Sequence, residues 1–271
     1  MLSAILPYMR CPRCSGTELL QDADGLTCRA CKVRYPFEMG ILDMMGNAAD
    51  EVITPFQRIM QTPLVVAIYE KLWRRIGYYI ASSRSFDREL QTVLDLARSK
   101  SSSRSLDLAC GPGVFTRPLA RCTEGIVVGL DLSWPMLMRA QRLAKTEGRQ
   151  NILLIRATAF SLPFVDSAFQ YINCCGALHL FDRPEAALKE IARVLDPQGA
   201  LSVQTTIRPA RSVGIAYILE KFIRFGFFDE SELRDLLNRQ GFEIAESQRH
   251  RISFTFLASR DKGVNRCRFE N

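Results

Sequence analysis

Two pairs of cysteines near the start of the chain have the spacing of a metal site. Cys11 and Cys14 form one Cys-x-x-Cys turn, Cys28 and Cys31 form a second, and thirteen residues separate the two pairs. Two such turns can bring four thiolates around one tetrahedral Zn²⁺ ion, with Zn–S distances of about 2.3 Å. Because four protein ligands leave no open coordination position, we expect a structural zinc site and not a catalytic one.

The same segment predicts a small zinc ribbon that depends on its metal to fold. Residues 1–46 are too few to fold on apolar burial alone, so metal binding, worth on the order of 10 kcal/mol, would supply folding free energy. Gly16 and Gly25 predict turns, and residues 18–20 and 26–27 predict short strands. A redox pair and two disulfides are the alternative interpretations, and a cytosolic chain favours the zinc site over both.

A second group of chemically capable residues lies at the ends of two predicted strands. The strand at 106–109 runs into the turn Cys110–Gly113, and the strand at 126–130 ends in Asp131, 18 residues after Gly113. Glycine lets a ligand approach the backbone, because a Cβ would block it, and it permits positive φ. A carboxylate at the end of the next strand can accept hydrogen bonds from both hydroxyls of a ribose. This order of strand, Gly-x-Gly turn, helix, strand and acid predicts a nucleotide-type site.

Such a site requires a doubly wound α/β sheet to position it. From Ser105 onward, apolar strands alternate with amphipathic helices, which is typical of a parallel sheet covered on both faces. Ligands of these sheets bind at the carboxyl ends of the strands, where the strand order reverses. The expected strands are 106–109, 126–130, 152–155, 170–174, 200–205, 242–245 and 252–258, and the expected helices are 114–121, 136–144, 184–195 and 232–240.

Residues 47–100 are expected to form a helical connection. Residues 64–73 have helical spacing, and residues 86–97 place Leu90, Val93, Leu94 and Ala97 on one face. A polar, Ser-rich stretch at 98–104 predicts a loop that ends the region. The chain then divides into a ribbon at 1–46, a helical cap or connection at 47–100 and an α/β core at 101–271.

The core motifs resemble those of class I S-adenosylmethionine-dependent methyltransferases, of the UbiE/MenG-like type. Residues 107–113 and 129–131 look like the first two motifs of that family, and residues 161–169, 176–179 and 190–199 look like its later motifs. The likeness covers residues 105–206 in the family's order and spacing. It implies a Rossmann-like sheet and S-adenosylmethionine as the methyl donor.

The resemblance also implies which residues bind the donor. By it, Gly111 and Gly113 let the backbone meet the methionine part, while Asp107 orients the loop or accepts from the ammonium group. Asp131 would hold the ribose, and Cys174 would line the site at the end of the fourth strand. The full implied set is Asp107, Ala109, Gly111, Gly113, Asp131, Leu132, Thr158, Ala159, Phe160 and Cys174.

Two positions depart from the family pattern. Ala109 replaces the first loop glycine, a tolerable change, and Thr158 replaces the carboxylate that usually receives the adenine amino group. A threonine hydroxyl can still accept one hydrogen bond, and Phe160 can cover the adenine ring. Loss of a charge-assisted bond, worth about 1 kcal/mol over a neutral one, predicts weaker but retained donor binding. A non-methylating relative is the alternative.

The acceptor side is predicted from one insert and one histidine. Residues 207–228 are rich in aliphatic and aromatic side chains, and in this fold an insert at that place lies over the acceptor pocket. We therefore expect a small, largely apolar acceptor of quinone or secondary-metabolite type; packing of the insert on the helical cap is the alternative. His179, just after the fourth strand, is the candidate catalytic base or acceptor contact, with packing against the next helix as its alternative.

Composition and charge limit the class of protein. The chain has 271 residues, 36 Lys and Arg against 29 Asp and Glu, a formal net charge of +7 and 47% apolar residues. It is too apolar to be disordered, and charges interrupt every apolar run before the ~18–20 residues of a membrane span. The only positive charge among the first ten residues follows the apolar ones, unlike a secretory signal, so we expect a soluble, cytoplasmic protein.

The sequence leaves the partner open between three interpretations. The first is a small-molecule acceptor, which residues 33–43 favour because they resemble the tail of zinc-ribbon proteins that attach to methyltransferases. The second is RNA, because the rRNA guanine-N1 methyltransferases also join an N-terminal zinc module to such a core and the net charge is +7. The third is a chain that binds the cofactor without transferring a methyl group. No feature of the sequence indicates an oligomeric state.

Overall fold

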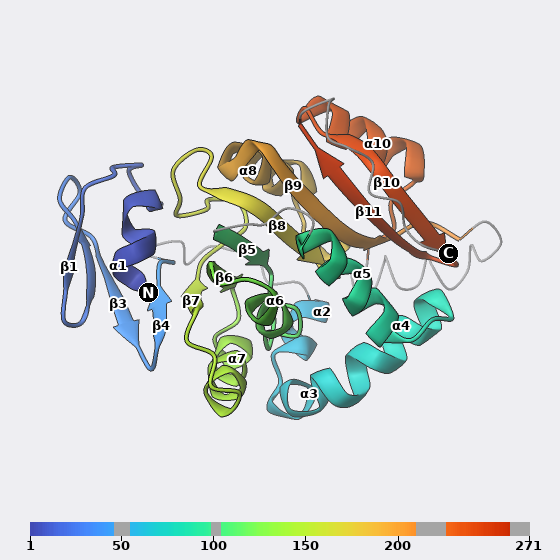
Figure 1. The fold of residues 1–271 in the computed structure, drawn as a ribbon, viewed down its shortest axis with the longest axis horizontal. Helices are drawn as coiled ribbons and strands as arrows, with labels where there is room; N and C mark the ends of the chain where they lie inside the picture. Colours follow the sequence, from blue (N-terminus) through green and yellow to red (C-terminus); the bar gives the residue numbers. More distant parts are fainter. Residues whose placement is uncertain (46–54, 99–103, 210–225, 261–271) are drawn as a thin grey trace.

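One eleven-stranded sheet crosses the part of the chain that the structure, a computed structural model, describes: residues 1–45, 55–98, 104–209 and 226–260 (Figure 1). Its strands, in spatial order, are β1 (Leu19–Asp22), β2 (Gly25–Cys28), β3 (Arg34–Glu38), β4 (Ile41–Asp43), β7 (Ile152–Arg156), β6 (Ile126–Asp131), β5 (Arg104–Leu108), β8 (Phe169–Cys175), β9 (Leu195–Thr206), β11 (Ser253–Ser259) and β10 (Glu243–His250).

The centre of this sheet is parallel, as the alternation of strands and helices predicts. β7, β6, β5, β8 and β9 pair in parallel, and β11 and β10 add an antiparallel edge. From β5 the chain adds β6 and β7 on one side and β8 and β9 on the other, so the strand order reverses between β5 and β8. The crevice at such a reversal is where α/β folds bind ligands. The predicted doubly wound, Rossmann-like fold is confirmed.

Helices cover both faces of the sheet (Figure 1). α5 (Phe86–Arg98), α6 (Thr116–Cys122) and α7 (Trp134–Thr146) bury their apolar sides in one hydrophobic cluster, and α8 (Pro184–Val194) and α10 (Glu230–Arg239) bury theirs in another on the opposite face. Local sequence sets where these helices begin. Ser133 accepts the Met136 N–H at the start of α7. A proline is the second residue of α7 and the first residue of α8, where no backbone donor is needed.

Some strands are longer than the sequence predicts. β9 begins at Leu195 and not at Ala200, because Leu195 pairs with Phe169 before an irregularity in the register. β10 runs to His250, beyond the expected end at residue 245, because it pairs with β11 along its whole length. In both places a partner strand supplies hydrogen bonds that a local pattern does not reveal.

The N-terminal ribbon is continuous with the core sheet, although the sequence suggests a boundary near residue 46. β3 and β4 form a hairpin, and β4 pairs in parallel with β7. Arg156 Nη1 also donates to Asp43 Oδ2 at 2.9 Å across this junction. The sequence did not predict β3 or β4, because Pro36 within β3 argues against a strand and β4 is only three residues long.

The helical connection forms a cap beside the core. It consists of α2 (Pro55–Met60), α3 (Pro63–Ile68), the π-helical turn η2 (Tyr69–Trp73), α4 (Arg74–Ser82) and α5. The expected Ser-rich loop falls largely on residues 99–103, and most of the expected insert 207–228 falls on residues 210–225, both outside the described residues. None of the described helices combines the length and apolar character needed to cross a bilayer.

Candidate functional site

The turn after β5 leaves the sheet in a backbone conformation that exposes its main chain. Ala109, Gly111 and Gly113 have positive φ values of 56°, 54° and 78°. A Cβ built on Gly111 would meet no heavy atom within 4 Å, because this position faces open space. The turn can therefore bring backbone atoms against a ligand without steric obstruction.

Asp131 ties the end of β6 to this turn. Its Oδ2 accepts the Gly111 N–H and its Oδ1 accepts the Ser133 N–H, both at 2.8 Å. Burial raises the pKa of Asp131, and the backbone N–H groups of Ser133, Gly111 and Leu132 partly offset the rise. Each carboxylate oxygen has a second lone pair that these bonds do not use. The side chain is therefore held rigidly and can accept two neighbouring hydroxyl groups.

Asp107 lies beneath the turn and not on the pocket wall. It is 1% exposed, and its Oδ2 accepts the Thr116 hydroxyl at 2.6 Å while its Oδ1 accepts the Asn173 amide at 2.7 Å. Burial raises the pKa of Asp107 to about 6. The carboxylate thereby joins β5, β8 and the first turn of α6, which corresponds to the orienting role expected for it.

A pocket opens at the carboxyl ends of β5, β6, β7 and β8 and encloses about 940 Å³, counted to its open mouth. Residues of the cap close one side of it. The lining is largely apolar and consists of Met60, Gln61, Tyr69, Leu108, Ala109, Gly111, Leu130, Asp131, Leu132, Ser133, Met136, Ala157, Ala159, Phe160, Gly176, Ala177, Leu180, Phe181 and Asp182. An apolar lining with a few polar groups is typical of a small-molecule or cofactor site.

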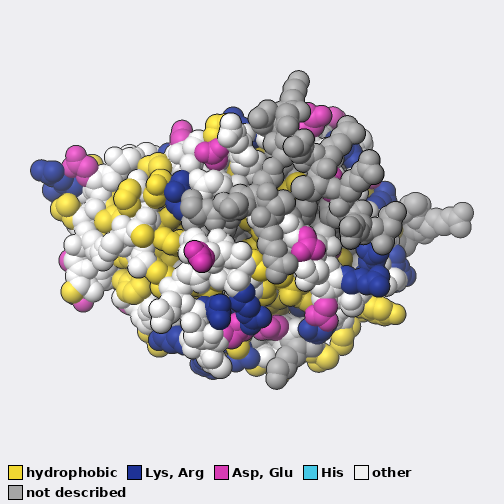
Figure 2. All heavy atoms as spheres, in the orientation of Figure 1, with side chains coloured by type: hydrophobic (Ala, Val, Ile, Leu, Met, Phe, Trp, Pro, Cys, Tyr) yellow, Lys and Arg dark blue, Asp and Glu magenta, His cyan; other side chains and the backbone are white. Residues whose placement is uncertain are grey.

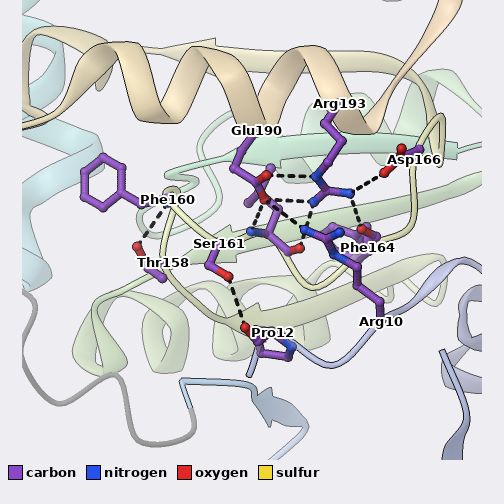
Figure 3. A network of polar contacts seen from close by, with 10 residues as sticks. Arg10, Pro12, Thr158, Phe160, Ser161, Phe164, Asp166, Glu190 and Arg193 are labelled. Atoms are coloured by element: carbon purple, nitrogen blue, oxygen red, sulfur yellow. Dashed lines mark hydrogen bonds and ion pairs between the residues drawn. The ribbon is translucent and has the colours of Figure 1, made fainter. Parts of the chain in front are cut away.

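The structure brings together most of the residues expected to bind a donor. Six of them line the pocket: Ala109, Gly111, Asp131, Leu132, Ala159 and Phe160. Gly113 belongs to the same turn but does not line the pocket. Thr158 turns its hydroxyl toward its own loop, where Oγ1 accepts the Phe160 N–H at 3.1 Å (Figure 3).

Cys174 requires a correction. The sequence predicts it in the site at the end of the fourth strand, but it is 0% exposed and packs in the hydrophobic core. β8 continues to Cys175, so the strand ends later than expected, and Gly176 and Ala177 form the wall instead. Burial raises the pKa of the Cys174 thiol to about 12.

His179, the candidate base, is buried. It is 8% exposed, sits in the short helix η3 (Leu178–Leu180) and does not line the pocket. Its Nδ1 lies 3.4 Å from Thr205 Oγ1, and its main-chain oxygen accepts the Gly226 N–H at 3.0 Å. Burial, with a smaller effect of the Arg74 charge, lowers its pKa to about 3. The imidazole is therefore neutral and lies against β9 and not against the next helix. A role as catalytic base or acceptor contact stays a prediction.

Sequence reasoning missed the cap residues Met60, Gln61 and Tyr69 and the mouth residue Asp182. Residues 64–73 do read as a helix, but the pattern does not tell which of its side chains reaches a distant strand end. In the structure Tyr69 begins the π-helical turn Tyr69–Trp73, and such turns recur at functional sites.

The four N-terminal cysteines form a second, separate cluster. The thiol sulfurs of Cys11, Cys14, Cys28 and Cys31 all lie within 4.8 Å of one another. The Cys11–Cys31 and Cys14–Cys28 sulfurs are 3.5 Å apart, too far for a disulfide of about 2.05 Å. A tetrahedral ion with Zn–S bonds of about 2.3 Å requires sulfurs about 3.8 Å apart, so the four thiols fit a metal and not the disulfide alternative.

Comparison with known proteins places the chain in a family. A family model described as a methyltransferase domain matches residues 106–199, from β5 into β9. A demethylmenaquinone methyltransferase of Staphylococcus saprophyticus is 30% identical over 168 residues, which cover 53% of this chain and 71% of that protein. The chain belongs to the class I S-adenosylmethionine-dependent methyltransferases.

Two further relatives extend the likeness beyond the α/β core. A chloroplastic methyltransferase of Arabidopsis thaliana, itself uncharacterized, is 26% identical over 230 residues, covering 79% of this chain and 64% of that protein. The chain thus spans just under two thirds of this plant relative. An S-adenosylmethionine-dependent methyltransferase of Aquifex aeolicus has the same fold, with a TM-score of 0.57 at 18% identity, covering 73% of this chain and 97% of that one. A cytoplasmic location stays a prediction.

Proposed function

We propose that this chain transfers a methyl group from S-adenosylmethionine to a small, largely apolar organic acceptor of quinone type. The observation that carries the proposal is the pocket itself. Its strand-end side has the exposed Gly111 backbone and the rigid Asp131 carboxylate, and its cap side has Met60 and Tyr69. S-adenosylmethionine supplies a methyl group that its sulfonium activates, so the protein has to bind, orient and exclude water.

The donor's parts can be matched to residues by chemistry. Asp131 has the free lone pairs to accept both ribose hydroxyls, and the open backbone at Gly111 suits the methionine part. Ala159 and Phe160 offer an apolar surface for the adenine ring. Thr158 does not line the pocket, and its hydroxyl accepts a hydrogen bond from its own loop, so it would add little toward the adenine amino group.

The acceptor's class is inferred from the remaining wall. Met60, Tyr69, Leu180 and Phe181 are apolar or aromatic, and the charged side chains among the described lining residues are Asp131 and Asp182. A flat, apolar ring system would bury its surface there and exclude water from the reacting atoms. The relative from Staphylococcus saprophyticus, by its name, methylates a quinone, which supports the same class here.

The distribution of charge on one face supports a small molecule over RNA. Binding to RNA depends on phosphate contacts from a concentrated basic surface. On the face shown in Figure 2, Lys and Arg side chains lie in separate groups, several of them beside Asp or Glu. We further propose that Zn²⁺ occupies the four-cysteine cluster, where it would cross-link the ribbon and take no part in the transfer.

Calorimetry with the zinc-loaded chain tests the proposal. We expect the chain to bind S-adenosylmethionine and S-adenosylhomocysteine, and to transfer labelled methyl to a reduced, short-chain naphthoquinone. Asp131→Asn places an amide N–H₂ against the N–H of Gly111 or Ser133. This clash of two hydrogen-bond donors should weaken the binding of S-adenosylmethionine by about 1–3 kcal/mol. Asp235→Asn, on the exposed side of α10, is the matched control.

Three results would count against parts of this proposal. A zinc-loaded chain that binds neither donor nor product is not a methyltransferase. A second result would be methyl transfer to rRNA and none to the quinol, together with RNA binding that depends steeply on salt. This result would show that the acceptor is RNA and not a small molecule. Metal analysis that finds far less than about one zinc per chain would contradict the assignment of Zn²⁺ to the cysteine cluster.

A further inference from the structure

The loop that follows β7 contacts both the pocket and the ribbon. Ala157, Ala159 and Phe160 line the pocket, and the next residues, 161–165, run along the N-terminal segment of the chain. Figure 3 shows the Phe160 ring turned away from the polar network that surrounds the rest of this loop. One short segment therefore connects the proposed donor site to the four-cysteine module.

Main-chain hydrogen bonds hold the loop against residues 8–10. The Val165 N–H donates to the Tyr8 oxygen at 2.9 Å, and the Arg10 N–H donates to the Pro163 oxygen at 3.0 Å. Between them, Met9 and Phe164 form an isolated antiparallel bridge, and both side chains are 0% exposed. Buried backbone groups need such partners, so each segment satisfies the other.

A further bond reaches into the Cys11–Cys14 turn itself. Ser161 Oγ donates to the main-chain oxygen of Pro12 at 3.3 Å (Figure 3), and Ser161 directly follows Phe160. The turn is closed by bonds from the Cys11 N–H to the Gly16 oxygen and from the Ser15 N–H to the Cys11 oxygen, both at 2.8 Å. A movement of this turn would reach Phe160 through one hydrogen bond and one peptide unit.

Side chains of α8 fasten the other end of the loop. Glu190 Oε2 accepts the Leu162 N–H at 2.7 Å, and Arg193 donates to the Phe164 oxygen at 2.6 Å. Arg193 pairs with Glu190 at 2.8 Å, and Arg10 approaches the same carboxylate at 3.7 Å (Figure 3). These three side chains are 14–20% exposed, so solvent screens their charges only weakly. Arg10 thus brings the ribbon's N-terminal segment into the network that fixes the loop.

We propose that the metal-loaded ribbon positions the adenine-side wall of the donor pocket, so that zinc binding raises the affinity for S-adenosylmethionine and S-adenosylhomocysteine. The proposal rests on the donor site and the zinc site proposed above. Without the ion, short hairpins of this size are only marginally stable, and loop 157–166 loses the partner of its main chain. Binding would then have to order the loop at an entropic cost. Arg10 and Ser161 act as positioning residues.

The coupling must be reciprocal, which provides a test that does not need a metal-free chain. If zinc raises the affinity for S-adenosylhomocysteine by some factor, the ligand raises the zinc affinity by the same factor. We expect saturating S-adenosylhomocysteine to raise the zinc affinity of the full chain by about five- to tenfold. The measurement is the equilibrium transfer of zinc from the chain to the chelating dye 4-(2-pyridylazo)resorcinol, which the ligand should reduce.

The outcomes separate this inference from the proposed function. A loaded chain that binds S-adenosylhomocysteine, yet loses zinc equally with and without it, overturns the coupling and leaves the methyltransferase function standing. A loaded chain that does not bind the ligand overturns both. Calorimetry on the same sample decides between these cases.

Substitutions that leave the cysteines intact locate the coupling. Ser161→Ala removes the bond to Pro12 and should lower ligand affinity about two- to twelvefold, the range of one lost neutral hydrogen bond. The same variant should weaken the protection of zinc by ligand, while its zinc affinity in the absence of ligand stays unchanged. Ser161→Thr keeps the hydroxyl and should restore both.

A matched pair of arginines provides the control. Arg10→Gln removes the charge next to Glu190 and should reduce the protection of zinc by ligand. Arg29→Gln, also in the ribbon, removes only an exposed pair with Glu18 and should behave as the parent chain. Equal behaviour of Arg10→Gln, Ser161→Ala and Arg29→Gln would show that the ribbon does not act through this loop.

Discussion

Arg74 occupies the space that a side chain at residue 176 would need. A Cβ built on Gly176 would lie 2.1 Å from Arg74 Nη1, and Gly176 has a φ of +80°. The guanidinium lies 5.4 Å from the ring centre of Phe86 and 5.7 Å from that of Phe115, and it donates to Gln204 Oε1 at 3.3 Å. This contact joins the start of α4 to the end of β8. The absence of a side chain at residue 176 leaves room for the Arg74 guanidinium against the pocket wall.

Gly176→Ala should therefore open the pocket on its cap side. The new methyl group would displace the Arg74 guanidinium, and a positive φ is unfavourable for alanine. We expect a loss of about 1–3 kcal/mol in the free energy of unfolding and a clear fall in S-adenosylhomocysteine affinity by calorimetry. Gly148→Ala is the control, because Gly148 also has a positive φ, of +65°, but its Cβ would meet nothing within 4 Å. Equal ligand affinity in Gly176→Ala and Gly148→Ala would show that Arg74 has no role in closing the cap.

Asp107 predicts a stability difference that depends on pH. Its folded-state pKa of about 6 lies above the unfolded value of about 3.9, so its contribution to stability is largest below pH 4 and is lost as the pH rises through 6. Asp107→Asn can keep both hydrogen bonds, by accepting from Asn173 and donating to the Thr116 oxygen. We expect the variant to be more stable than the parent at pH 8, by at most about 3 kcal/mol, and equally stable near pH 4.

Urea denaturation of the Asp107→Asn variant and the parent chain, from pH 4 to pH 8, measures this difference directly. Other titrating groups are the same in both chains and cancel in the subtraction. A stability difference that does not change with pH would mean that Asp107 titrates normally in the folded chain.

His179 predicts the opposite dependence at acid pH. Its folded-state pKa of about 3 lies below the unfolded value of about 6.5, so the unfolded chain binds the proton first and stability falls as the pH drops below 6.5. This one group contributes a slope of up to about 1.4 kcal/mol per pH unit. His179→Gln should remove that slope and cost stability mainly near pH 7, as followed by denaturation at pH 4–7. If His179→Gln leaves the dependence of stability on pH unchanged, the imidazole of the parent chain is charged and solvated in the folded state.

Thr158→Asp tests the departure from the family pattern. One carboxylate oxygen can keep the bond to the Phe160 N–H that the hydroxyl now accepts, and the other is available to the donor's adenine amino group. A charge-assisted bond there should tighten S-adenosylhomocysteine binding several-fold, by about 1 kcal/mol. Thr158→Asn, with one neutral acceptor, is the control and should bind as the parent does. If the aspartate variant gains nothing, residue 158 does not face the adenine.

The sequence by itself determined the fold class and the strand ends at which the pocket opens. Alternating apolar strands and amphipathic helices specify a doubly wound sheet, because each element buries one face at its own period. The Gly111–Gly113 turn and Asp131 follow strands that end at the same edge, so their proximity follows from chain order. The two Cys-x-x-Cys turns are equally local, and their spacing sufficed to bring four thiols together.

Only the tertiary structure decided which residues complete the pocket and which are excluded from it. Tyr69 and Arg74 reach the end of β8 from a helix about a hundred residues earlier, and no local pattern encodes that approach. Cys174 lies near the site in sequence but packs in the core, because side-chain direction at a strand end depends on where the strand stops and what packs on it. His179, in η3, is buried beside Thr205 of β9. The joining of β4 to β7 likewise depends on backbone partners that meet only in the folded chain.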